Sequence, residues 1–91
     1  MDETVIDNRE RQRFELQLEG QVVFADYRRQ SGRLMITYVE TPPALRGAGA
    51  AGRLMQGVMD LAQAEGIKVM PICPYARAWL QRHPEFRDQT L

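Results

Sequence analysis

Three glycines and three alanines lie close together in the stretch Arg46–Gly52, which suggests a site for an anion. Small side chains leave backbone N–H groups uncovered. A helix is predicted to begin at Ala50, so the unpaired N–H groups of its first turn and the positive end of its dipole would point at one place. We therefore predict that this loop holds a phosphate group. The predicted binding residues are Arg46, Gly47, Ala48, Gly49, Ala50 and Ala51.

The single cysteine, Cys73, is a second group that could do chemistry. It lies between an apolar segment, predicted as a strand, and a helix that Pro74 would open. The positive end of a helix dipole favours a thiolate over a thiol, which would make Cys73 reactive. The alternative is a small buried hydrophobic residue, the usual state of a free cysteine.

These groups must be positioned by a small set of strands and helices. Alternation of apolar and polar residues predicts a half-buried strand around Phe14, Leu16 and Leu18. Further strands are predicted over 22–28, 33–40 and 67–72, and helices over 50–65 and 74–83. The predicted order β-β-β-α-β-α gives an α/β fold, with a small, mixed, mainly antiparallel sheet and two helices. The first three strands form a meander, and the helix 50–65 crosses over to a parallel strand. We expect residues 1–9 to be flexible and residues 10–91 to form one domain.

The predicted core contains one stripe of the first helix, together with Trp79 and the methionines. The stripe comprises Leu54, Met55, Val58, Leu61 and Ala62. The strand 33–40 is apolar on both faces, as expected for a central strand. His83 precedes Pro84 at the end of the second helix, and we interpret it as a capping residue rather than a metal ligand.

Composition excludes several classes of protein. The 91 residues carry 12 basic and 12 acidic side chains, and this balance argues against nucleic-acid binding. One cysteine can form neither an internal disulfide nor a cysteine-based metal site. No apolar stretch approaches the roughly 18 residues of a membrane span. We expect a cytoplasmic protein, without a metal and without a membrane partner, that is a monomer or a weak dimer.

The glycine loop can be compared with three phosphate-binding motifs. Its letters match G-x-G-x-x-G, but two prolines separate it from the preceding strand, and the next strand ends without the acid that would bind a ribose. The ATPase phosphate loop is excluded because Arg53 and Leu54, not Lys and Ser or Thr, follow Gly52. The third motif is R-x-x-G-x-A, which begins here at Arg46.

This third motif resembles the pyrophosphate-binding motif of GNAT-type N-acetyltransferases. The resemblance extends over residues 12–86, through the Pro42-Pro43 pair, Cys73-Pro74-Tyr75 and the run Arg82-His83-Pro84-Glu85-Phe86. Together these segments are similar to the YjdJ-type family of minimal GNAT proteins, whose fold would be a truncated GNAT fold. One position departs from that family: Tyr38 stands where it usually has a histidine.

The resemblance implies that acetyl-CoA is the co-substrate and that an amine accepts the acetyl group. An open site would suit a protein or peptide lysine, or a polyamine. Glu40 would be the base, by its position beside the loop, unless it is a solvated carboxylate at a strand end. The strand 33–40 would splay from its neighbour, and the N–H of Val39 would stabilise the oxyanion.

Cys73 would be either an acetyl-accepting nucleophile or an acid/base group beside the sulfur of CoA. Tyr75 could protonate the departing thiolate or could simply pack, and Tyr38 could line the cleft or the core. Because Tyr38 replaces the histidine and the chain is short, a CoA-binding module with little or no catalysis is the alternative function.

Overall fold

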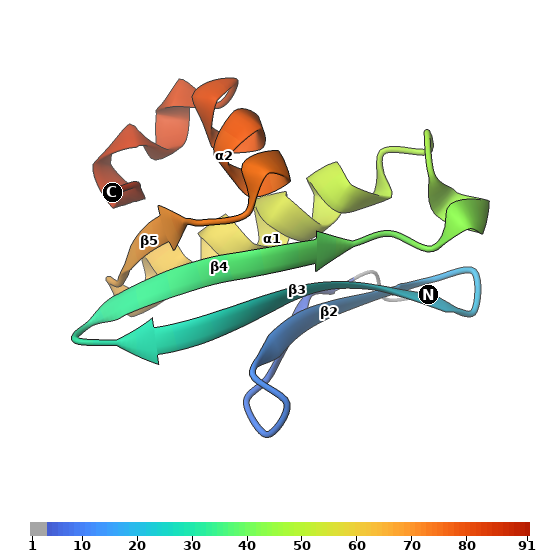
Figure 1. The fold of residues 1–91 in the computed structure, drawn as a ribbon, viewed down its shortest axis with the longest axis horizontal. Coiled ribbons are helices and arrows are strands. Elements are labelled where there is room, and N and C mark those ends of the chain that lie inside the picture. The colour runs from blue at the N-terminus through green and yellow to red at the C-terminus, as the bar shows by residue number, and fades with distance from the viewer. Residues whose placement is uncertain (1–3) are drawn as a thin grey trace.

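A computed structural model describes residues 4–91, and within them it contains one five-stranded sheet and two α-helices (Figure 1). The strands are β1 (Ile6–Asn8), β2 (Arg13–Leu18), β3 (Gln21–Gln30), β4 (Arg33–Glu40) and β5 (Lys68–Pro71). The helices are α1 (Ala50–Glu65) and α2 (Pro74–Gln81), with short 3-10 helices η1 (Pro43–Leu45) and η2 (Pro84–Gln89).

The sheet has the order β1-β2-β3-β4-β5, which confirms the predicted mixed α/β architecture. Strands β1 to β4 form an antiparallel meander, and β5 pairs with β4 in parallel. The parallel step is possible because α1 carries the chain back along the sheet between β4 and β5 (Figure 1). The bounds of β4 and α1 agree with the prediction, whereas β5 and α2 are slightly shorter than predicted.

The core lies between one face of the sheet and α1, which contacts β2, β3, β4 and β5. Alternate strand residues face it, as their period of two requires. Its fully buried strand residues include Phe14, Leu16, Val23, Ala25, Leu34, Ile36 and Val69. α2 and η2 extend this core with Ala76, Trp79, Leu80 and Phe86.

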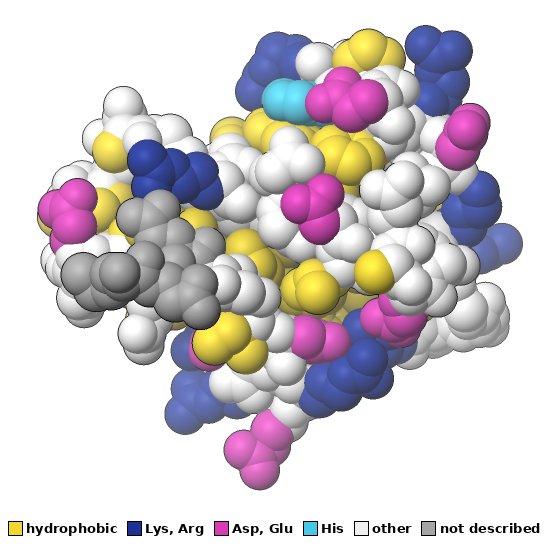
Figure 2. Space-filling view, turned by 180° about the vertical axis from the view of Figure 1, so that it is seen from behind, with side chains coloured by type: hydrophobic (Ala, Val, Ile, Leu, Met, Phe, Trp, Pro, Cys, Tyr) yellow, Lys and Arg dark blue, Asp and Glu magenta, His cyan; other side chains and the backbone are white. Residues whose placement is uncertain are grey.

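The helix α1 differs from the predicted stripe at one position. Leu61 is 37% exposed, whereas Met59, predicted to lie in the core but outside this stripe, is fully buried. Both residues lie at the border between the buried and the exposed face of α1, and the helical period alone does not fix where this border runs. On the side of the molecule where α1 lies, Lys, Arg, Asp and Glu side chains are interspersed (Figure 2).

Part of the segment 1–9, for which the sequence predicts flexibility, forms the strand β1. β1 pairs with β2, with Ile6 opposite Glu15 and Asn8 opposite Arg13. Val5 is buried against α1 at Gly57, where an added Cβ would lie 2.2 Å from a Val5 methyl carbon. Residues 1–3 lie outside the described residues.

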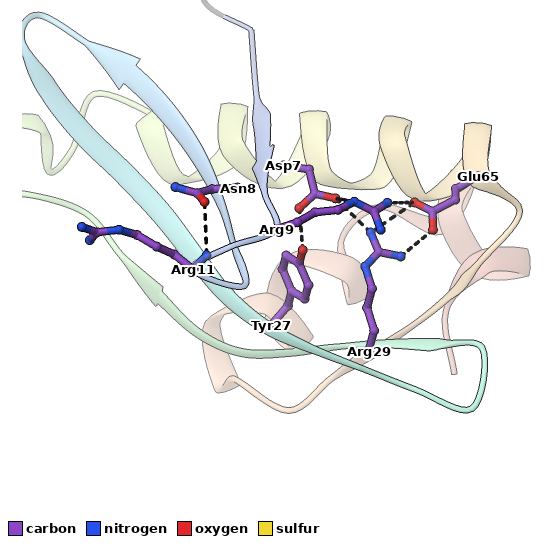
Figure 3. A network of polar contacts seen from close by, with 7 residues as sticks. All are labelled: Asp7, Asn8, Arg9, Arg11, Tyr27, Arg29 and Glu65. Carbon is purple, nitrogen blue, oxygen red and sulfur yellow. Dashed lines mark hydrogen bonds and ion pairs between the residues drawn. The ribbon is translucent and has the colours of Figure 1, made fainter.

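A polar cluster, the Arg29 network, holds β1 in place (Figure 3). The hydroxyl of Tyr27 donates to Asp7 at 2.5 Å, and Arg29 donates to Asp7 at 3.0 Å. Arg29 also forms a two-pronged ion pair with Glu65 at the end of α1, and Arg9 lies near both acids. The hydrogen bond to Glu65 is the main reason why the pKa of Arg29 is raised. The network therefore ties β1, β3 and α1 together.

The pairing of β3 with β4 contains an irregularity that matters for the site. Tyr27 pairs with Ile36, but its neighbour Asp26 pairs with Tyr38, so Thr37 is an extra residue in β4. The hydroxyl of Thr37 donates to the carbonyl of Asp26 at 3.3 Å. Such a β-bulge shifts the alternation of side chains between the two faces of a strand.

Candidate active site

The bulge in β4 turns the side chains of Tyr38 and Glu40 to the face of the sheet opposite α1. After the bulge, Val39 pairs with the buried Ala25, while Glu40 pairs with Phe24. Tyr38 is 48% exposed, and its ring centroid lies 6.3 Å from that of Phe24. Tyr38 therefore lies outside the core, on the same open surface as Glu40. The two faces of β4 are thus not equally apolar.

Glu40 contacts both Tyr38 and Arg46. The hydroxyl of Tyr38 donates a hydrogen bond to the Glu40 carboxylate. On the other side, an Nη atom of Arg46 lies 3.8 Å from a Glu40 oxygen. Arg46 also donates from Nε to the carbonyl of Thr41 at 3.2 Å, which directs its side chain toward the end of β4. These contacts join the end of β4 to the start of the glycine loop.

The hydrogen bond to Glu40 raises the pKa of Tyr38 above its ordinary value. The cause is electrostatic, because deprotonation would place a phenolate beside a carboxylate. Tyr38 therefore stays protonated over the physiological pH range. It can donate a hydrogen bond but cannot replace a histidine as a base.

The loop between β4 and α1 has the backbone that a phosphate site needs. Gly47 and Gly49 both have positive φ angles, 85° and 77°, which favour glycine. Gly49 is the N-cap residue of α1, and no side chain caps the helix. Residues 46–49 are exposed.

Several backbone N–H groups of this loop have no acceptor among residues 4–91. The first hydrogen bond of α1 runs from the N–H of Arg53 to the carbonyl of Gly49 at 3.1 Å. The N–H groups from Gly49 to Gly52 are therefore without partners inside the helix. Ala48 differs, because its N–H bonds to the carbonyl of Leu45 at 3.2 Å. The N–H of Arg46 is occupied as well, by the carbonyl of Pro43 at 3.3 Å, so neither Arg46 nor Ala48 offers a free N–H to a phosphate.

Strands β4 and β5 separate next to this loop. Their pairing ends with Ile36 opposite Pro71. At that point the carbonyl of Ile36 accepts the N–H groups of both Ile72 and Cys73, each at 2.9 Å. β4 continues to Glu40 without β5, while the chain after β5 turns away into α2 (Figure 1). The edge of β4 from Thr37 to Glu40 that faces away from β3 is thus left unpaired by β5.

Cys73 lies on the other side of this separation, as the N-cap residue of α2. Its side chain is only 6% exposed, and it is a free cysteine. Its carbonyl accepts the N–H of Arg77 at 3.0 Å, which is the first turn of α2. The residue is thus held at a fixed point, by Ile36 on one side and by α2 on the other.

Of the two aromatic residues of α2, Trp79 is packed in the core and Tyr75 is partly exposed. Trp79 is buried, and its indole nitrogen lies 3.4 Å from where a Cβ on Gly52 would be, so α2 packs beside the first turn of α1. His83 stacks on Trp79, and its Nδ1 lies 2.7 Å from the Trp79 carbonyl, which confirms that His83 caps the helix. Tyr75 is 37% exposed, and burial of its hydroxyl raises its pKa.

The structure brings some predicted residues together and leaves others apart. Tyr38, Glu40 and Arg46 form one polar cluster, the Glu40 cluster, next to the loop. Cys73 is linked to β4 through the backbone of Ile36 and forms no hydrogen bond or ion pair with Glu40. The hydrogen bond between Tyr38 and Glu40 was not predicted. Their spacing of two residues in a strand was the signal that could have revealed it.

Two further features concern residues 4–91 as a whole. No group of three or more His, Cys, Asp or Glu residues is arranged there to hold a metal ion. None of the helices within this range is both long and apolar enough to cross a membrane.

Comparison with known proteins identifies the family. The profile of the family described as GCN5-related N-acetyl-transferase matches residues 13–89. The fold is similar to the NMR solution structure of a GCN5-like N-acetyltransferase candidate from Staphylococcus aureus, with a TM-score of 0.70 and 17% identity. That match covers 98% of this chain and 88% of the other. No curated protein matches.

The chain therefore belongs to the GCN5-related N-acetyltransferase family and has its fold. Acetyl transfer is the general activity of this class. The separated strands and the loop at the start of α1 lie within the matched residues.

Proposed function

We propose that the protein transfers an acetyl group from acetyl-CoA to an exposed amine, and that it belongs to the YjdJ-type branch of minimal GNAT proteins. The observation that carries the proposal is the unpaired end of β4 beside a loop with free N–H groups. The Cys73-Pro74-Tyr75 segment and the capping His83 support the YjdJ-type assignment. A cytoplasmic location and a monomeric or weakly dimeric state stay predictions from the sequence.

The loop fits the pyrophosphate of CoA on three grounds. Gly47 and Gly49 adopt positive φ angles, N–H groups of the first turn of α1 have no partners in the part of the chain that the structure describes, and this turn contains no acidic residue. Arg46 adds a positive charge at the start of the loop. Acetyl-CoA would supply the activated acetyl group as a thioester. The unpaired backbone of β4 would hold the pantetheine arm by hydrogen bonds.

Glu40 would accept the proton of the attacking amine. Its carboxylate already accepts one hydrogen bond from Tyr38, but a carboxylate has about four lone-pair positions, so a second donor can bind. Tyr38 and Arg46 hold the carboxylate from two sides, which reduces its freedom to rotate. A positioned base of this kind contributes typically 10²–10⁴-fold to a rate.

Val39 and Tyr75 would complete the transfer. The N–H of Val39 would donate to the developing oxyanion, because Val39 lies beyond the last residue of β4 that β5 pairs with. The hydroxyl of Tyr75 would protonate the leaving thiolate. Burial raises its pKa, so the hydroxyl is protonated and has a proton to give, although the same shift makes it a weaker acid.

Cys73 keeps two alternative roles. As a nucleophile it would accept the acetyl group before the amine does, and as an acid/base group it would act beside the sulfur of CoA. Its position at the start of α2, next to the point where β4 and β5 separate, suits both. The exposed Tyr38 beside Glu40 suits an acceptor that protrudes from its own surface, such as a lysine side chain or one end of a polyamine.

The second candidate function is a module that binds CoA without turnover. The observation that favours it is the hydrogen bond from Tyr38 to Glu40, because Tyr38 replaces the family's histidine and stays protonated. A protein of this kind would keep the loop and the separated strands, and would lack a working base.

One experiment separates the two functions. Intact mass is measured after incubation with acetyl-CoA, for the natural protein and for Cys73→Ser, together with turnover on a panel of peptides and polyamines. A 1:1 adduct that the variant lacks supports a nucleophilic Cys73, and turnover without an adduct supports direct transfer. CoA binding without either supports the binding module, and no CoA binding contradicts both functions.

A pair of variants tests the loop itself. Ala48→Asp places a carboxylate at the proposed phosphate site, and Ala64→Asp makes the same change at an exposed position near the other end of α1. We expect the first to abolish the thermal shift caused by CoA and the second to keep it. A ligand at 100 times its dissociation constant stabilises a protein by about 2.7 kcal/mol, so the shift is measurable.

A further inference from the structure

A groove with a volume of about 610 Å³ lies on a different part of the molecule from the Glu40 cluster and the loop. It is bounded by β5, by one side of α2, by η2 and by the last two residues of the chain. None of Tyr38, Glu40 or Cys73 lines it. A volume between about 300 and 1,000 Å³ is typical of sites that bind small molecules.

Most of the groove is apolar. Six of its ten lining residues are apolar, and they come from β5 and the segment after it, from α2, from η2 and from the chain end: Met70, Pro71, Ile72, Leu80, Pro84 and Leu91. Ile72 is 44% exposed and Leu91 is 51% exposed, so part of this surface faces solvent. An apolar ligand that covers this wall removes apolar surface from water, and this burial favours binding.

The charged side chains of the groove all have one sign. Its two charged lining residues are Arg77 and Arg87, and no acidic residue lines it. Within residues 4–91, neither guanidinium forms a hydrogen bond or an ion pair. By contrast, Arg13, Arg29 and Arg46 each lie within 4.0 Å of a carboxylate.

We propose that this groove binds a small amphipathic carboxylate, with its apolar body on the apolar wall and its carboxylate held by Arg77 and Arg87. Arginine suits this task because its planar fork of donors matches the two oxygens of a carboxylate. Two unpaired arginines beside an apolar wall should therefore bind an anion with an apolar body more tightly than neutral or cationic ligands of equal size. The groove would bind this ligand whether or not the protein transfers acetyl groups.

The edge of β5 argues for a small molecule rather than an extended peptide. Leu91 already donates to the carbonyl of Val69 at 2.8 Å, and Thr90 forms a bridge to Val69. Pro71 has no N–H to donate to an added strand. A peptide could therefore form few main-chain hydrogen bonds along this edge, and binding would depend on the apolar wall and the two arginines.

The test uses octanoate and 1-octanol, which share an apolar chain and differ in charge. Amide chemical shifts of the ¹⁵N-labelled protein are followed during titration with each. We expect octanoate to shift the signals of Ile72, Arg77 and Leu91, and to bind at least about tenfold more tightly than 1-octanol. The double variant Arg77→Gln/Arg87→Gln should lose this preference while keeping the spectrum of a folded protein.

Arg82→Gln is the matched control, because Arg82 follows α2, is exposed and does not line the groove. It should bind octanoate as the natural protein does. Equal affinity for octanoate and 1-octanol, or equal weakening by Arg82→Gln, would overturn the proposal. Displacement of octanoate by CoA would do so as well, since the groove would then belong to the donor site.

Discussion

Two polar clusters of similar composition lie near opposite ends of α1. In the Arg29 network a tyrosine donates to Asp7, which also pairs with an arginine. In the Glu40 cluster Tyr38 donates to Glu40, which also pairs with Arg46. The hydrogen bonds of the first cluster join residues 20 to 36 positions apart, whereas Tyr38 and Glu40 are two positions apart.

The two clusters also differ in burial. Tyr27 is 3% exposed and Tyr38 is 48% exposed. A half-buried cluster that connects three elements stabilises the fold, because breaking it leaves charges without partners away from water. An exposed pair within one strand contributes little to stability. Its carboxylate, however, stays accessible to a substrate, so we interpret the first cluster as structural and the second as functional.

The largest effect should come from Glu40→Gln. The variant keeps an acceptor for the Tyr38 hydrogen bond and removes the proposed base, so we expect kcat/KM to fall by about 10²–10⁴-fold. The melting temperature should barely change. Steady-state kinetics with acetyl-CoA and a reactive amine, together with a thermal scan, measure both. Undiminished kcat/KM would exclude Glu40 as the base.

A large loss of stability should follow from Arg29→Met, which leaves Asp7 and Glu65 with only Arg9, whose side chain is 65% exposed, as a shared partner. We expect the free energy of unfolding to fall by about 1–3 kcal/mol, with the activity of the folded protein unchanged. For a domain of this size each kcal/mol corresponds to about 4–8 °C in Tm.

Arg46→Met is the control for that comparison. The Arg46 side chain is 65% exposed, so its removal should change stability by less than about 0.5 kcal/mol. Denaturant unfolding of both variants distinguishes the clusters. Equal losses of stability would contradict the division into a structural and a functional cluster.

A smaller loss should result from Gly57→Ala, which tests how β1 is held. Alanine favours a helix by roughly 0.5–1 kcal/mol over glycine, but the new Cβ would lie 2.2 Å from a Val5 methyl carbon. Because overpacking costs typically 1–3 kcal/mol, we expect a net loss and faster amide exchange in β1. Gly52→Ala, whose Cβ would meet its nearest neighbour at 3.4 Å, should be tolerated. An increase in stability for Gly57→Ala would show that Val5 is not held against α1.

The smallest effect concerns alkaline pH. Burial, and next the hydrogen bond to Asp7, raise the pKa of Tyr27 above the 10.0 of a free tyrosine. Since the folded protein holds this proton more tightly than the unfolded chain, the contribution of Tyr27 is complete below pH 10. It is lost as the pH rises through the raised pKa.

Denaturant unfolding at pH 9 and above pH 10 measures this loss, and Tyr27→Phe should reduce it. Tyr38→Phe should change the pH dependence of stability less, because solvent screens the exposed hydrogen bond that raises the pKa of Tyr38. Equal effects of the two variants would mean that the pKa of Tyr27 is not set by its buried network.

Prediction from sequence succeeded where the pattern is local. α1 and β4 have the predicted bounds, because helical periodicity, the glycines around α1 and the prolines after β4 define them within a few residues. β1 was not predicted, because three residues show no periodicity and pair only when Val5 and Asp7 find partners on α1 and β3. The bulge at Thr37 was also missed, since it depends on the register of β3 against β4.

The same division holds for the candidate site. The glycine loop could be found because its residue types dictate its backbone, as the positive φ angles of Gly47 and Gly49 show. The face of the sheet on which Tyr38 and Glu40 meet could not be predicted. One extra residue in β4 moves the side chains that follow it to the opposite face. The occupied N–H of Ala48 depends likewise on the turn formed by η1.

The sequence by itself determined the order of the elements and the glycine positions that shape the loop, and it predicted an anion site there, with Glu40 and Cys73 as candidate reactive residues. These follow from interactions within a few residues, namely backbone preferences, helix ends and alternation. Only the tertiary structure decided that β4 leaves β5 at Ile36, that Tyr38 and Glu40 share an open face, and that Arg29 ties β1 to α1. Those outcomes depend on strand register and on contacts between residues far apart in the chain, which no local pattern encodes.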